Sequence, residues 1–143
     1  MTSPLSNELF FQVHRGLLHT APGAKTDKSS LGMHWSATPW HAEERASRHL
    51  DYAEHKGEVW HGTAPISSVE TNTKVLKKRG FAGFEGKDPL GEKEVPLKKG
   101  ALVTVTGVTK YRLKETRHPE GFISGTEVKR RERRFNPPRE MKA

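Results

Sequence analysis

The chain has 143 residues with no cysteine, and its 25 lysines and arginines exceed its 17 acidic residues, giving a formal net charge of +8. This length suits one domain with a single core, and a chain without cysteine can form neither a disulfide framework nor a zinc site made of thiolates. No stretch approaches the roughly 18 apolar residues that a membrane helix requires, and no signal peptide is visible. We therefore expect a soluble, cytoplasmic monomer that makes no membrane contact.

Runs of branched and aromatic residues predict six β-strands, at residues 9–14, 31–38, 58–64, 92–97, 102–113 and 121–128. Polar segments rich in glycine and proline separate them. With two helices in the first half, this order predicts an α+β domain over residues 1–128, built on a mostly antiparallel sheet. The basic residues 129–143 are expected to form a flexible C-terminal tail, because blocks of like charge usually remain solvated.

Two helix starts carry capping residues. Thr38 is predicted to cap a first helix that has Pro39 at its first position and ends near Gly57. The apolar stripe of that helix consists of residues at helical spacing, namely Ala42, Ala46, Leu50 and Ala53. Ser67 and Glu70 have the spacing of a capping box, which predicts a second helix over residues 68–78.

Three of the predicted strands carry polar residues in otherwise core-like segments. These residues are Arg15, Ser36 and the pair formed by Glu92 and Glu94. The two glutamates share one face of an extended strand, where like charges cost stability unless something uses them. Each feature also has a structural interpretation, since Arg15 can serve in an ion pair and the glutamates can form the solvated face of an edge strand. The ordered set of three favours a functional site.

This set resembles the arginine-serine-glutamate class of the ADP-ribosyltransferase family. The arginine of the family's first strand corresponds to Arg15 in Val-His-Arg-Gly-Leu, the serine motif to Ser36-Ala-Thr, and the Glu-x-Glu motif to Glu92-Lys-Glu94. The resemblance runs from Phe10 to Tyr111. It implies the family's fold, a split and mostly antiparallel β-sheet with flanking helices. It also implies a mono-ADP-ribosyltransferase that uses NAD as co-substrate, needs no metal, and transfers ADP-ribose to a macromolecular acceptor.

The resemblance implies catalytic roles for Glu94, Glu92 and Ser36. Glu94 would bond the ribose and stabilise the positive charge that develops when the bond to nicotinamide breaks, as carboxylates do in glycoside-cleaving enzymes. Glu92 would orient the acceptor, which favours a protein arginine. Ser36 would bond the nicotinamide ribose and help to place Glu94.

The resemblance also implies a binding site for NAD and a recognition loop. Arg15 would bind the phosphate region, the backbone of Gly16 would reach the nicotinamide amide, and Ser36 and Thr38 would complete the cofactor-binding set. Residues 81–90 occupy the position of the acceptor-recognition loop and contain Phe81 and Phe84. The aromatic residue that stacks on nicotinamide is left open among Trp40, Trp60 and Phe84.

Three other functions remain as alternatives, one of which is a transferase whose acceptor is a nucleic acid held by the basic tail. The same cleft would serve an NAD glycohydrolase. A non-enzymatic nucleic-acid-binding domain would use the basic tail, residues 74–79 and scattered aromatic residues. The eight histidines do not have the spacing of a known metal site, so no metal is expected.

Overall fold

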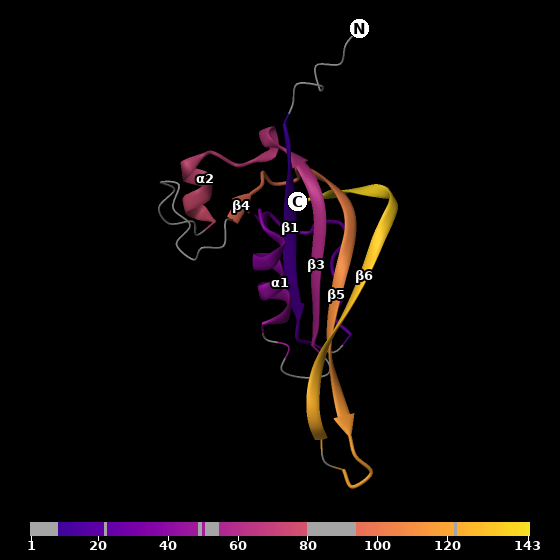
Figure 1. Cartoon of the computed structure of the whole chain (residues 1–143). Helices are drawn as coiled ribbons and strands as arrows, with labels where there is room; N and C mark the ends of the chain where they lie inside the picture. The colour runs from indigo at the N-terminus through magenta and orange to yellow at the C-terminus, as the bar shows by residue number, and fades with distance from the viewer. Residues whose placement is uncertain (1–8, 22, 49, 51–54, 80–93, 122) are drawn as a thin grey trace.

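The computed structural model describes residues 9–21, 23–48, 50, 55–79, 94–121 and 123–143. Over these residues, one antiparallel sheet has the order β4-β2-β1-β3-β5-β6 (Figure 1). Its strands are β1 (Phe10–His19), β2 (His34–Ser36), β3 (Lys56–Pro65), β4 (Glu94–Pro96), β5 (Leu102–Arg117) and β6 (Ile123–Lys142). The described helices are α1 (Pro39–Ser47), α2 (Thr73–Lys78) and the short 3-10 helix η2 (Ile66–Ser68). The expected α+β class with a mostly antiparallel sheet is confirmed.

Each predicted strand has a counterpart, but the lengths differ from the predictions. β1 continues five residues past the predicted end and pairs along its whole length with β3. β2 begins only at His34, because Gly32 has a φ of +95°, which lies outside the extended region. Residues 92–93 of the predicted fourth strand lie outside the described residues, so β4 is described from Glu94.

The basic C-terminal segment is not the flexible tail that its charge pattern predicted. Residues 129–142 belong to β6, which pairs with β5 from Leu102 opposite Lys142 to Arg117 opposite Ile123. Phe135 and Met141 of this strand are buried in the core. Such a strand is difficult to recognise in a run of charged residues, because an edge strand can carry charged side chains toward solvent.

Helix α1 begins at Pro39 as predicted, and Ala42 and Ala46 are buried against the sheet. Thr38 is its N-cap residue but makes no capping hydrogen bond; its hydroxyl is hydrogen-bonded to the His41 ring instead. The predicted end near Gly57 is wrong, because α1 ends at Ser47 and Gly57 lies in β3. Ala53, the last residue of the predicted stripe, lies outside the described residues.

Helix α2 is shorter than predicted, and Ser67 does not cap it. The cap is Asn72, whose Oδ1 accepts hydrogen bonds from the backbone N–H groups of Lys74 at 3.0 Å and Val75 at 3.4 Å. The segment before it is extended, because the N–H of Glu70 donates to the carbonyl of Pro96 at 2.9 Å. This bond holds the segment beside the end of β4. Neither α1 nor α2 is long and apolar enough to cross a bilayer.

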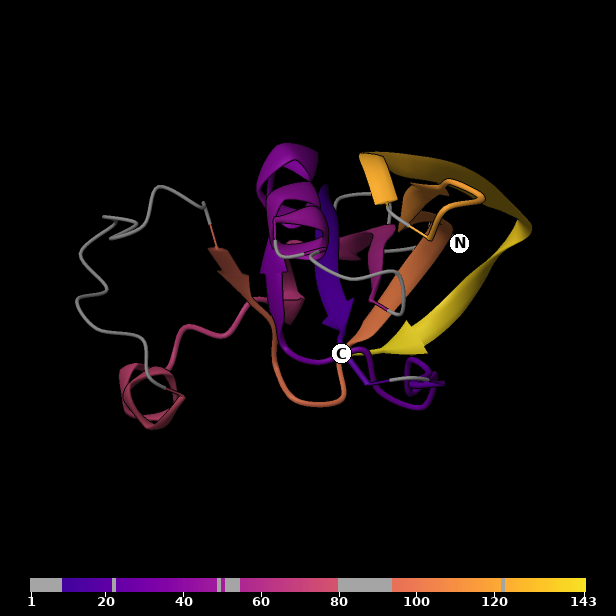
Figure 2. The same ribbon diagram turned by 90° about the horizontal axis from the view of Figure 1, so that it is seen from below.

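The sheet buries side chains on two faces. We call the face covered by α1 the helix face. The backbone of α1 lies very close to the sheet on this face. A Cβ atom at Gly16 would stand 2.1 Å from the backbone oxygen of Ala42, and one at Gly57 would stand 2.0 Å from the backbone oxygen of Ala46. The opposite face carries the larger core, made mainly of Val13, Leu31, Trp35, Trp60, Leu97, Val103, Val105 and Phe135. Figure 2 shows α1 on one side of the sheet and residues 23–30 on the other.

Candidate active site

Four polar side chains form a row across β4, β2, β1 and β3 on the helix face. The strand register places Ser36 opposite Glu94, His14 opposite Ser36, and His61 opposite His14. Directly opposite residues of antiparallel strands share a face, with Cβ atoms about 5 Å apart. Ser36 and His14 are buried, at 3% and 7% exposure, whereas Glu94 is partly open to solvent near the edge of the sheet. The structure thus brings together two of the predicted site residues, Ser36 and Glu94.

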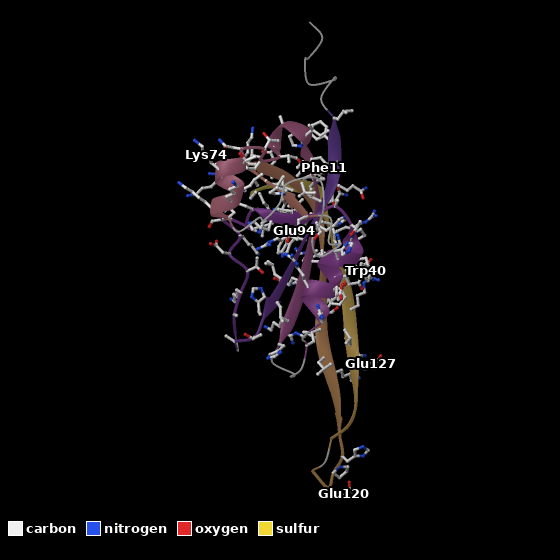
Figure 3. All side chains as sticks on the ribbon, turned by 90° about the vertical axis from the view of Figure 1, so that its left-hand side faces the viewer. Phe11, Trp40, Lys74, Glu94, Glu120 and Glu127 are labelled. Atoms are coloured by element: carbon white, nitrogen blue, oxygen red, sulfur yellow. The ribbon has the colours of Figure 1, made fainter. Side chains whose placement is uncertain are left out.

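Arg45 of α1 reaches Glu94 and forms an ion pair with it. Figure 3 shows Glu94 between α1, which carries Trp40, and α2, which carries Lys74. About a third of the Arg45 side chain and a quarter of the Glu94 side chain are exposed, so solvent reaches the pair. Sequence reasoning missed Arg45, because only the placement of β4 beside β2 brings a side chain of α1 to this carboxylate.

Arg15 lies on the opposite face and binds the segment that leads into β2. Its Nε donates to the carbonyl of Leu31 at 2.9 Å, and its Nη1 donates to the carbonyl of His34 at 2.6 Å. Gly32, between these two residues, has no room for a side chain, since a Cβ atom there would stand 2.8 Å from Nη2 of Arg15. Arg15 therefore holds the backbone two residues before Ser36 against β1.

The fold places the remaining predicted site residues at separate positions. Gly16 is the close-contact point for α1, as described above. Thr38 is half-buried at the start of α1. Of the aromatic candidates, Trp40 is 63% exposed and contacts His41 edge-on, whereas Trp60 is buried on the opposite face and stacks on Phe135. Trp40 alone of these two is available to a ligand on the helix face.

The histidine part of the row is a hydrogen-bonded chain that sequence reasoning did not identify. Nδ1 of His14 lies 2.8 Å from Nδ1 of His61, and Nε2 of His61 lies 2.8 Å from the hydroxyl of Thr109. Burial, together with repulsion from His61, lowers the pKa of His14 to about 4. Burial is also the largest cause of the lowered pKa of His61. Nε2 of His14 is buried without a hydrogen-bond partner among the described residues. The sequence feature that could have identified His14 is its position directly before Arg15 in a strand. Because successive side chains of a strand point to opposite faces, His14 points to the face that carries Ser36.

Glu94 interacts electrostatically with Arg45 and Arg15. The pKa of Arg15 is lowered, first by burial and then by the nearby charge of Arg45, while Glu94 acts in the opposite sense. The pKa of His34 is lowered mainly by burial; Glu94 raises it, and Arg15, Arg79 and Arg45 lower it. A carboxylate that is partly open to solvent in this position can stabilise a positive centre of a ligand.

Several predicted residues lie outside the described part of the chain, namely Glu92, Phe81 and Phe84. Within the described residues, no group of three or more histidine, aspartate or glutamate side chains is arranged to hold a metal ion. Comparison of the chain with protein-family models, curated protein sequences and solved structures found no match.

Proposed function

We propose that this chain is a NAD-dependent mono-ADP-ribosyltransferase of the arginine-serine-glutamate class, with the fold of that family. The observation that carries the proposal is the pairing of Ser36 with Glu94 on neighbouring strands, beside the strand that carries Arg15. Motifs far apart in the sequence are thereby adjacent. Arg15 contributes by positioning the backbone that leads into Ser36, since its hydrogen bonds go to that segment.

The reaction transfers ADP-ribose from NAD to a nucleophile. The bond between the nicotinamide nitrogen and C1′ of the ribose breaks, and its electron pair leaves with nicotinamide. A carboxylate beside the ribose stabilises the positive charge that develops at C1′. Glu94 takes this role, and Ser36 bonds the ribose. A nitrogen of the acceptor guanidinium then forms the bond to C1′ and releases its proton to Glu92.

Replacing Glu94 by glutamine tests the proposal. The release of nicotinamide from NAD should fall by about 10²-fold or more, because the substitution removes a charge directed at the transition state. Glu127→Gln is the matched control, since Glu127 lies on the β5-β6 hairpin far from Glu94 (Figure 3). Arg45→Gln breaks the same ion pair but keeps the carboxylate. Turnover of the Glu94 variant at the wild-type rate would refute the proposal, and an equal loss in the Arg45 variant would assign the effect to the ion pair.

The acceptor is a separate question, for which the proposal is a protein arginine. Glu92→Ala should reduce transfer to an arginine-rich protein much more than hydrolysis of NAD to free ADP-ribose, because only transfer needs a group that orients the guanidinium. Labelled NAD distinguishes the two products. Hydrolysis without any transfer by the wild-type protein would instead support an NAD glycohydrolase.

A further inference from the structure

The ribbon formed by β5 and β6 has very different charges on its two faces. On the helix face, Arg130 forms an ion pair with Glu132 at 2.6 Å, and Arg130 also approaches Tyr111. On the opposite face, the strand register collects six exposed cations with one carboxylate, Glu127, among them. These cations are Lys110, Arg112, Lys114, Lys129, Arg131 and Arg133.

Like charges stand directly opposite one another in this arrangement. Lys110 is opposite Arg131 on one side and Glu58 of β3 on the other, whereas Arg112 is opposite Lys129 on one side and Lys56 of β3 on the other. Directly opposite like charges destabilise a sheet. In the described part of the chain, no carboxylate forms an ion pair with any of these five cations. The sheet therefore carries a repulsion that an external polyanion would relieve.

The same face leads into a cavity of about 650 Å³ between the sheet and residues 24–28. Its floor includes Phe135, and the guanidinium groups of Arg133 and Arg139 lie over this ring at 5.6 Å and 4.4 Å from its centre. Lys25 and Lys28 also line the cavity. The cavity also contains two carboxylates, of which Glu58 is hydrogen-bonded to Thr26 and His19, and Asp27 accepts hydrogen bonds from Ser29.

We propose that the basic face of the sheet binds single-stranded nucleic acid. We define this basic face by the five cations that stand opposite one another together with Arg133, namely Lys56, Lys110, Arg112, Lys129, Arg131 and Arg133. Cations at every second residue lie about 7 Å apart along each strand and form a track for a phosphate backbone. The cavity is large enough for a nucleotide but not for a duplex, and the planar guanidinium groups over Phe135 offer surfaces on which a base stacks. Ser36 and Glu94 lie on the helix face, so this binding is independent of the proposed NAD site.

The hairpin itself is accessible to such a ligand. Its tip extends past the ends of β1 and β3 (Figure 1), and Glu120 and Glu127 lie far from Glu94 (Figure 3). The chain from Leu102 to Lys142 contains 11 lysines and arginines against five glutamates, a net charge of +6 out of +8 for the whole chain. The hairpin therefore carries most of the charge that would attract a polyanion.

Binding of a fluorescent oligonucleotide of about 16 nucleotides, followed by anisotropy, tests the proposal. With about five phosphate contacts on a single strand, the slope of log K against log salt should be about −3.5, so affinity should fall by about 10²-fold between about 50 and about 200 mM salt. The double variant Arg112→Gln/Lys129→Gln should reduce the slope by about 1.4. It should fold at least as well as the wild type, because it removes a like-charge pair.

The matched control is Arg130→Gln/Arg134→Gln, which removes the same charge from the helix face of the same ribbon. This control should keep the wild-type slope. An equal loss in both double variants would overturn the proposal, because it would reduce the effect to net charge. Equal competition by poly-glutamate, or tighter binding of a duplex of the same length, would also overturn it. Nicotinamide release by each variant is measured in parallel and should not change.

Discussion

Replacing His14 by asparagine should make the protein less sensitive to acid. The His14 ring is buried in β1, with Nδ1 at 2.8 Å from His61 and Nε2 without a partner among the described residues. Burial and the neighbouring His61 lower its pKa from 6.5 to about 4. Between these pH values the ring is neutral in the folded protein and protonated in the unfolded chain. Asparagine keeps an amide near the position of Nδ1 but does not titrate.

The size of the effect follows from the difference in bound protons between the two states. Above pH 6.5 neither state binds the proton, and His14 has no pH-dependent effect on stability. As the pH falls from 6.5 toward about 4, the unfolded chain takes up a proton that the folded protein does not. The free energy of unfolding then falls by about 1.4 kcal/mol per pH unit, or about 3 kcal/mol in total, and levels off below about pH 4.

Urea unfolding, followed by tryptophan fluorescence at about pH 7 and about pH 4.5, measures this effect. Between these pH values the wild type should lose about 2 to 3 kcal/mol more than His14→Asn. Taking the difference removes the contribution of the carboxylates, which both proteins share. Parallel losses in the wild type and His14→Asn would show that His14 does not titrate as argued.

Three further substitutions test how the site is built. Gly16→Ala should destabilise the fold by about 2 kcal/mol or more, because the new methyl group would collide with the backbone oxygen of Ala42. Thermal unfolding measures this loss, and an unchanged midpoint temperature would refute the close contact. Arg15→Lys should lower the free energy of unfolding, measured in urea, by about 2 kcal/mol and also reduce nicotinamide release, since a lysine cannot bind both carbonyls that Arg15 binds. A loss of stability with unchanged nicotinamide release would show that the segment before β2 does not position the site. Asn72→Ala should cost about 1 kcal/mol, because two N–H groups of α2 lose their acceptor, while Asn72→Asp should restore most of it; equal losses would mean that the cap is not used.

The parts of the fold that could be predicted from the sequence are those that depend on local pattern. The branched residues of β1, β3 and β5 indicate strands wherever they pair, and Pro39 with Ala42 and Ala46 indicates the start and buried stripe of α1. The prediction failed where a local signal competed with a tertiary one. Ser67 has the spacing of a cap, but pairing of the following residues with the end of β4 moves the helix start to Asn72.

The candidate site divides in the same way. Residue patterns along the chain are sufficient to place Ser36 and Glu94 on extended segments with polar faces and Arg15 at a core-facing position. Only the strand register decided that Ser36 stands opposite Glu94 and opposite His14, because a shift of one residue would turn each side chain to the other face. The ion pair of Arg45 with Glu94 likewise required α1 to be packed against β1 and β3, and the pairing of β5 with β6 turned an apparent tail into a strand. Local pattern indicates which residues extend or coil, whereas the contacts between them arise when distant segments bury their apolar surface together.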